Sequence, residues 1–301
     1  MKPTSIIFLI VSVLLIVGGI ITCAVAKDIA VTDGYALFND TEGGGSYVHH
    51  DFKASSVTKI ELTVTDAEIN IYGGAEASYI EFFNFRDGLY TLAATGNSIT
   101  LDEVPNLKSL LSFQGGFSFS GMRYFLRLGN TETGPKRVNV YIGADSAIKN
   151  ITVSGDNCTV YADKLGIRAD LQIHADESIS LTGKDIRTTS ALTLEAPSVS
   201  LHLEDCSLNE LTLNTSKADA VLDRFYCANM YAELASGSMS VQIPANASHY
   251  TYDITGAKAV CHLNGETLSL PYKPESTGDN TPTGEIVIQA GNAAVDLTIA
   301  E

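Results

Sequence analysis

The chain has 301 residues and 45% of them are hydrophobic, so it can bury a sizeable core and is not a disordered polypeptide. Its formal net charge of −16 at pH 7 repels phosphate backbones and anionic lipid. Composition and charge together argue against nucleic-acid binding.

The first predicted element is an apolar segment without a charged side chain, residues 5–26, "SIIFLIVSVLLIVGGIITCAVA". A helix of this length, at about 1.5 Å per residue, spans a hydrocarbon core. We therefore predict a single-pass membrane anchor, with residues 1–4 in the cytoplasm because Lys2 favours that side. The rest of the chain would then be extracytoplasmic. Two alternatives stay open: secretion after signal-peptide cleavage at Ala26, and lipidation of Cys23.

Residues 27–58 are predicted to form a linker and an N-terminal cap, followed by an ectodomain at residues 59–301. In this ectodomain a pattern of two apolar residues flanking a polar one recurs with a nearly constant period. The second apolar residues step by 20, 21, 19, 21 and 20 positions: Val153, Ile173, Leu194, Leu213, Leu234 and Ile254. A second pair follows each first pair after a polar turn, so each unit contains two short strands.

One such unit cannot bury its apolar edge alone, so the units must stack. We predict an all-β fold: a single-stranded, right-handed parallel β-solenoid with rungs of about 20 residues. Leu62/Val64 and Ile69/Ile71 match the same template earlier in the chain. Ile286/Ile288 and Val295/Leu297 match it later, after a loop at residues 272–284. The rungs are expected to follow one another in chain order.

The period is lost in an aromatic, glycine-rich insert at residues 102–136. An exposed group of large apolar residues marks a partner-binding surface, so we predict a candidate interaction patch there. Its residues are Leu110, Leu111, Phe113, Phe117, Phe119, Met122 and Phe125. The alternative is a cap that covers an open end or side of the solenoid and prevents edge-to-edge growth.

The turn-punctuated rungs and the segment "VNVYIGADSAIKNITVSGDNCTVYA" at residues 138–162 resemble the bacterial putative-adhesin family of unknown function, which includes LiaG-like envelope proteins. The resemblance covers residues 59–299, although Gly143 stands where the family often has proline. It implies a membrane-tethered, surface-exposed solenoid linked to adhesion or envelope stress. It transfers no catalytic residue.

Four cysteines lie beyond the anchor: Cys158, Cys206, Cys227 and Cys261. The period places Cys158 and Cys261 on inward columns, several rungs apart and too distant for a disulfide. We predict buried free thiols that pack as small hydrophobic side chains. The alternative is a Cys206–Cys227 bridge, which requires a two-residue register slip at residues 218–222.

Outward columns suggest a few pairs of polar side chains. Asp163, Lys184 and Glu204 are predicted to alternate in sign on one column, which stabilises the stack modestly. In the slipped register Asp223 would lie beside His202, as a solvated pair or as an acid/base or metal site.

Glu233 and Asp253 are predicted to share another outward column. Two carboxylates about 5 Å apart can perform retaining glycoside hydrolysis, although a plain acidic surface explains them as well. The six histidines form no spaced metal motif, and GxSxG, Walker A and GxGxxG motifs are absent. We therefore expect no catalytic residue, cofactor or metal site.

The sequence thus favours a non-enzymatic surface protein, adhesin-like or sensing envelope stress, that presents a β-solenoid to a protein or glycan. Its partners would be the membrane, through residues 5–26, and an envelope protein or cell-wall glycan. The alternatives are a carbohydrate-active β-helix enzyme, which needs converging polar side chains, and a self-assembling filament, which needs uncapped apolar ends.

Overall fold

The computed structural model describes residues 47–53, 55–85, 90–103, 135–166, 168–187, 190–245, 249–274 and 282–299. These residues fall in one compact unit, and their regular structure is β-strand, so the predicted all-β class is confirmed. The predicted anchor lies outside the described ranges. Within them, no helix has the length and apolarity needed to cross a membrane.

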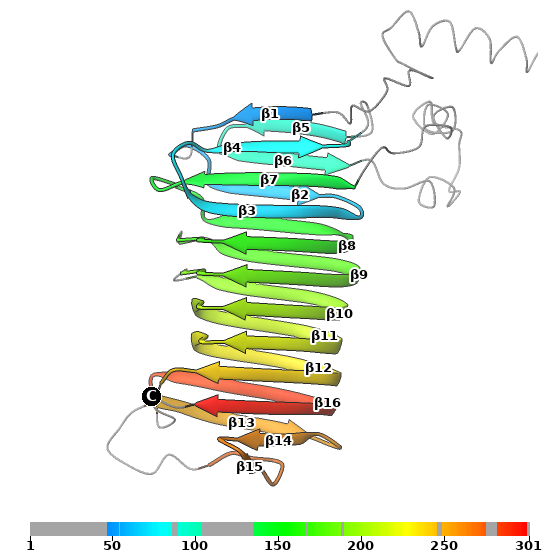
Figure 1. Ribbon diagram of the computed structural model, residues 1–301, viewed down its shortest axis with the longest axis vertical. Coiled ribbons are helices and arrows are strands. Elements are labelled where there is room, and N and C mark those ends of the chain that lie inside the picture. The colour runs from blue at the N-terminus through cyan, green and yellow to red at the C-terminus, as the bar shows by residue number, and fades with distance from the viewer. Residues whose placement is uncertain are drawn as a thin grey trace, which may run out of the picture. The chain divides into compact units, whose positions relative to one another are not determined.

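Five long strands form the middle of this unit and pair in parallel in chain order (Figure 1). They are β8 (Asn150–Asp163), β9 (Asp170–Lys184), β10 (Ala191–Glu204), β11 (Ser207–Asp223) and β12 (Tyr226–Ile243). Buried and exposed residues alternate along each strand, because successive side chains of a strand point to opposite faces. Each period of about 20 residues therefore corresponds to one long strand of the stack and the corner that follows it.

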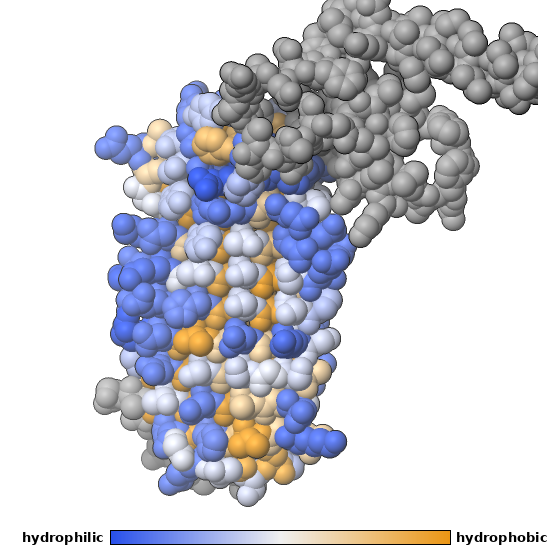
Figure 2. All heavy atoms as spheres, turned by 45° about the vertical axis from the view of Figure 1, so that its right-hand side comes forward, coloured by the Kyte–Doolittle hydropathy of each residue, from blue (hydrophilic) through white to orange (hydrophobic). Residues whose placement is uncertain are grey.

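The predicted apolar spine is confirmed in these strands. Val153, Ile173, Leu194 and Leu213 face one another in register, and each is at most 1% exposed. Like residues therefore pile up in columns along the stack. Figure 2 shows the same order from outside, where residues of like hydropathy run lengthwise over one face.

A residue in the left-handed conformation follows the end of each of the strands β8 to β11. The residues are Lys164, Asp185, Asp205 and Arg224, with φ between 47° and 54°. Side chains other than glycine rarely adopt this conformation, so its recurrence at each corner shows that the stacking geometry imposes it. The corner is thus repeated with the same period as the apolar spine.

The predicted rung order is wrong at the C-terminal end. The last strand, β16 (Gly284–Ile299), pairs in parallel with β12 and separates it from β13 (Tyr250–Gly256) and β14 (Val260–Leu263). The long β16 matches β12 along almost its whole length, whereas β13 and β14 are short and suit the end of the stack. Ala232, and not the predicted Leu234, lies opposite Leu213, so the column is also shifted by two residues.

The predicted N-terminal rung exists with a different register. It consists of β2 (Lys59–Thr63) and β3 (Ala67–Ala75), which both pair in parallel with β8. Leu62 faces Val153 and Ile69 faces Val160, so the paired residues are Ile60/Leu62 and not Leu62/Val64. The spacing of five residues between the two strands is kept, but it runs from Leu62 to Ala67.

The prediction of a wholly parallel solenoid is wrong, because the sheet is mixed and antiparallel pairs occur at both ends. β1 pairs with β4, β4 with β7, β5 with β6 and β14 with β15, all antiparallel. Their bounds are β1 (Tyr47–Asp51), β4 (Tyr79–Phe83), β5 (Tyr90–Thr95), β6 (Ser98–Glu103), β7 (Lys136–Gly143) and β15 (Glu266–Thr267). Short reversed strands of this kind cover edges that would otherwise accept another strand.

Candidate functional site

A shallow groove of about 690 Å³ runs lengthwise over the outer surface, where the long strands bend. One wall is a single column of side chains, one from each of six neighbouring strands. In spatial order they are His174, Glu195, Asn214, Glu233, Gln289 and Thr255. Because neighbouring strands lie about 4.8 Å apart, these groups form a row with nearly constant spacing. We call this feature the longitudinal groove.

The floor of the longitudinal groove consists mainly of small residues. Ala175, Ala196 and Ala290 are buried there, next to the wall residues in the chain. On the opposite rim a Cβ atom at Gly291 would lie 2.5 Å from the Ala235 carbonyl oxygen, so only glycine fits. Small side chains at this level keep the groove open.

Thr215 fixes the bend in the middle of β11. It is buried, and its hydroxyl lies 3.2 Å from the carbonyl oxygen of Pro197 and 2.9 Å from that of Lys217. A buried hydroxyl without a partner is costly, so these contacts hold the bend in one conformation. The groove is therefore supported by the strand bends beneath it.

The longitudinal groove is acidic. Asp176, Glu195 and Glu233 line it, and His174 lies 3.4 Å from Glu195 through Nδ1 and Oε2. Among the described residues, Glu233 makes no ion pair or hydrogen bond through its side chain, and the same holds for Asn214 and Gln289. These exposed groups are thus available to a ligand.

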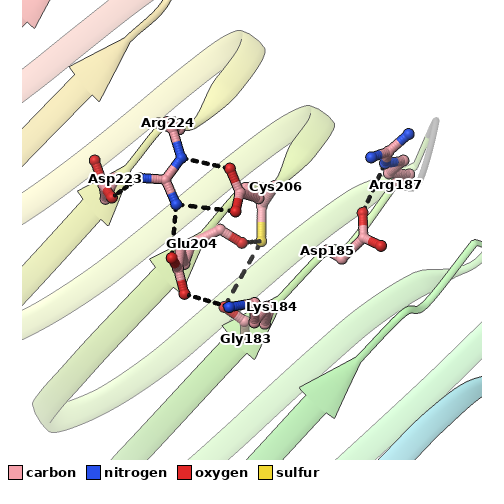
Figure 3. Close-up of polar contacts among 9 residues, drawn as sticks. Gly183, Lys184, Asp185, Arg187, Glu204, Cys206, Asp223 and Arg224 are labelled. Carbon is pink, nitrogen blue, oxygen red and sulfur yellow. Dashed lines mark hydrogen bonds and ion pairs between the residues drawn. The ribbon is translucent and has the colours of Figure 1, made fainter.

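A charged corner lies at the ends of β9, β10 and β11 (Figure 3). Arg224 donates to Glu204, Asp205 and Asp223 at 2.6, 2.5 and 2.6 Å, and Lys184 donates to Glu204 at 2.9 Å. The predicted column of Asp163, Lys184 and Glu204 is confirmed by the strand register.

Hydrogen bonds from Lys184 and Arg224 lower the pKa of Glu204, and those from Arg224 lower the pKa of Asp205. The same carboxylates raise the pKa of Arg224. Nearby, Arg187 donates to Asp185 at 2.7 Å. Since each of these cations already has a carboxylate partner, the charged corner ties neighbouring strands together and offers no free charge to an anion.

The four cysteines of the described chain are buried free thiols, as predicted. Burial raises the pKa of Cys158 and Cys206 to about 11 and that of Cys227 to about 12. The alternative Cys206–Cys227 bridge is not formed, because Cys227 lies opposite Leu208, two positions beyond Cys206. These thiols are packing groups.

The predicted pairing of His202 with Asp223 is wrong. β10 and β11 pair with a constant offset of 19 residues, so His202 faces Val221 and Asp223 faces Glu204. The slip on which this pairing depended does not occur.

The predicted alignment of Glu233 with Asp253 is also wrong. Glu233 faces Gln289, whereas Asp253 faces Val287, so β16 separates the two carboxylates and they are offset along it. Asp253 instead forms an ion pair with Lys273 at 2.6 Å. Within the described ranges, no group of three or more His, Cys, Asp or Glu side chains is arranged to hold a metal ion.

The predicted interaction patch, Leu110 to Phe125, lies outside the described residues. β6 continues to Glu103 and β7 begins at Lys136, so both ends of the predicted insert, residues 102–136, are strand residues. The side chains of Glu103 and Lys136 form an ion pair at 2.7 Å. Only 15% of the Glu103 side chain and 10% of the Lys136 side chain are exposed. Thr65 completes the contact, because its amide donates to Glu103 at 2.8 Å and its carbonyl accepts from Lys136.

The longitudinal groove was not predicted from the sequence. Its wall residues share one signal, since Glu195 and Asn214 each follow the second apolar residue of a periodic pair. Reading that position along the whole period would have predicted the row from His174 to Asn214. Glu233 escapes this rule because of the two-residue shift between β11 and β12, and the order of the last members depends on the observed place of β16.

Neither the protein-family models nor the curated proteins include a match to this chain. Solved structures do resemble it. One is a putative cell adhesion protein of Clostridium sporogenes (15% identity, TM-score 0.39), where the match covers 85% of this chain and 99% of that one. Another is a putative adhesin of Bacteroides fragilis (11%, TM-score 0.33; 84% and 97%). A third is a putative lipid binding protein of Parabacteroides distasonis (11%, TM-score 0.38; 85% and 97%).

Proposed function

We propose that this chain is a non-enzymatic, membrane-tethered surface protein, adhesin-like or part of envelope sensing, and that its longitudinal groove holds an extended partner. The partner is a protein segment or a glycan strand of the cell envelope. In this proposal residues 5–26 anchor the chain, and the stacked strands act as a right-handed solenoid that displays the groove outside the cytoplasm.

The row of polar side chains in the longitudinal groove carries this proposal. Hydrolysis needs an acid and a second carboxylate on either side of one bond. Here Glu195 and Glu233 lie two strands apart with Asn214 between them, so the groups follow a line. A line of donors and acceptors with constant spacing suits an extended ligand that repeats along its length.

The charges of the groove limit the class of ligand. Asp176, Glu195 and Glu233 repel phosphates and other polyanions, in keeping with the net charge of −16. A neutral glycan or a basic peptide meets no such repulsion. Binding measurements with one probe of each class distinguish between these two partners.

The test uses the full-length chain in detergent micelles and measures its binding to soluble chito-oligosaccharides and to an oligolysine peptide. The double variant Glu195→Arg/Glu233→Arg should weaken binding of the preferred probe at least tenfold, because it reverses two charges in the groove. Glu76→Arg/Glu266→Arg makes the same charge change at exposed positions elsewhere and should bind like the wild type. Equal binding by both double variants, or binding of neither probe by the wild type, would overturn the groove proposal.

The antiparallel strands at the two ends of the sheet favour this proposal over a self-assembling filament. β15 and the segment around Tyr272 pair with β14 and β13 at the C-terminal end, where Tyr272 exchanges hydrogen bonds of 2.8 and 2.9 Å with Ile254. The outermost strand at this end, β15, has only two residues, and a very short edge strand offers little to a further strand. Light scattering of the full-length protein should show no concentration-dependent fibre growth.

A further inference from the structure

A second hollow of about 410 Å³ lies where β3, β8 and β9 meet. Aromatic, amide, carboxylate and ammonium groups line it together. They are Glu68, Asn70, Tyr72, Tyr161, Asp163 and Lys184. We call it the tyrosine hollow. It shares no residue with the longitudinal groove, and its volume is within the range of about 300–1,000 Å³ that small-molecule sites occupy.

The amide of Asn70 is held in one orientation. Its nitrogen donates to Glu68 Oε1 and to Asn139 Oδ1, both at 3.0 Å. Asn139 in turn directs its own nitrogen to Glu81 Oε2 at 3.5 Å, and an ionised carboxylate only accepts, so the Asn139 carbonyl must face Asn70. Both amide hydrogens of Asn70 are therefore occupied.

The carbonyl oxygen of Asn70 is left as a fixed acceptor. Asn70 is only 5% exposed, yet no buried side-chain nitrogen or oxygen of the described residues lacks a partner. Nothing among the described residues donates to this oxygen, so it keeps some exposed surface, and the hollow that Asn70 lines is the space beside it. A fixed, nearly buried acceptor binds a donor without having to be ordered first.

The ring of Tyr72 is also held in place. It stacks on Tyr141 with a centroid distance of 5.0 Å, and Tyr141 stacks on Tyr79 at 4.3 Å. One face of Tyr72 is thus covered from β7, and the other is directed along the stack toward Asp163, its strand neighbour on β8. Tyr161, in the next column, is 44% exposed. The negative faces of such rings attract polarised C–H groups.

These groups together suit a ring that carries several hydroxyls. Asn70, Glu68 and Asp163 accept hydrogen bonds and Lys184 donates one, while the tyrosines offer apolar surface. Two carboxylates against one ammonium group leave a small acidic excess in this lining, which disfavours a phosphate. A peptide strand does not fit, because β3 already pairs with β7 and β8, and β8 also pairs with β9, so neither has a free edge.

We propose that the tyrosine hollow binds a single pyranose ring, as a free sugar or as one residue of a glycan. The C–H face of the sugar packs against the exposed Tyr161, beside the edge of Tyr72, and a hydroxyl donates to the Asn70 carbonyl. The tyrosine hollow lies outside the longitudinal groove, and sugar binding there does not depend on whether the groove binds an extended partner.

The experiment is saturation-transfer NMR on the full-length protein in detergent micelles, with methyl glycosides of glucose, galactose, mannose and N-acetylglucosamine as probes. At least one sugar should receive saturation. Tyr161→Ala should weaken its binding at least tenfold. Tyr226→Ala is the matched control, because Tyr226 is 43% exposed at a different corner, and it should bind like the wild type.

A second variant tests the acceptor itself. Asn70→Ser keeps a small polar residue but moves the acceptor back from the hollow, and it should weaken binding of the same sugar while circular dichroism stays unchanged. Absence of saturation for all four sugars overturns the proposal, as does equal loss in Tyr161→Ala and Tyr226→Ala. The groove variant Glu195→Arg/Glu233→Arg should keep the sugar signal, so failure of the two proposals can be told apart.

Discussion

Ile286, in the last strand of the chain, lies directly opposite Met230 of β12 and faces Tyr252 of β13 on its other side. The end of the chain therefore completes the interior of the sheet, and the edge is formed by an earlier segment. The core at this end depends on β16, which contributes Ile288 and Leu297 among other fully buried side chains.

Ile288→Ala should destabilise the protein strongly. Ile288 is fully buried between Ala232 and Ile254, and truncating a large core side chain costs about 2–5 kcal/mol. Urea unfolding followed by circular dichroism measures the change. Thr298→Ala is the control, because Thr298 is exposed on the same strand and should change the free energy of unfolding by no more than about 0.5 kcal/mol. Equal midpoints for the two variants would contradict the inserted position of β16.

The charged corner should make stability depend on acid. The pKa of Glu204 is lowered from its ordinary 4.5 and that of Asp205 from 3.8, so folding favours their ionised forms. A lowered pKa adds stability that is present above the ordinary value and is lost as the pH falls through the folded-state value. Arg224→Met should therefore reduce the free energy of unfolding at pH 7, and its difference from the wild type should shrink as the pH falls below the ordinary values of these carboxyls.

Urea unfolding of the wild type and of Arg224→Met at a series of pH values checks this. Arg168→Met is the control, because Arg168 is exposed and forms no ion pair with the residues that the structure describes. A difference between wild type and Arg224→Met that stays constant from pH 7 to 2.5 would show that the ion pairs do not stabilise the fold.

Periodicity is enough to predict which side chains of β8 to β11 face inward. Val153 and Leu213 lie in line because successive side chains of a strand alternate between inside and outside. With a repeat of about 20 residues, one register buries the apolar side chains on both sides of each bend. The inward position of Cys158 follows from the same rule, and so does its free thiol.

Periodicity does not determine which rung lies beside which. Ile286/Ile288 and Tyr252/Ile254 both carry the apolar pair that fits next to Met230, so the pattern is satisfied by either order. Strand length decides between them, and it cannot be read from the apolar pairs. The tyrosine hollow was equally out of reach, because Tyr72 and Tyr161 meet only through the pairing of β3 with β8.

The thiols of the described chain should be unreactive in the native protein. Burial raises the pKa of Cys227 to about 12 and raises that of Cys261 as well, so at pH 8 these groups are protonated, and only a thiolate reacts fast. In a Cys23→Ser background, Ellman's reagent should label Cys158, Cys206, Cys227 and Cys261 slowly until denaturant is added. Fast labelling without denaturant, or a Cys206–Cys227 disulfide in non-reducing peptide mapping, would refute the buried-thiol assignment.

The Glu103–Lys136 ion pair joins the two strand ends that flank the insert, and its loss should be more costly than the loss of a surface pair. Lys136→Met leaves the Glu103 carboxylate mostly buried and without its cation, a change that costs about 3–5 kcal/mol where pairs are fully buried. Glu103→Gln/Lys136→Met removes both charges and should recover part of that loss. Arg137→Met, which breaks the more exposed pair with Glu68 at 3.2 Å, should cost about 1 kcal/mol or less. Urea unfolding of the three variants ranks these costs, and a Lys136→Met protein as stable as Arg137→Met would mean that the pair does not hold the base of the insert.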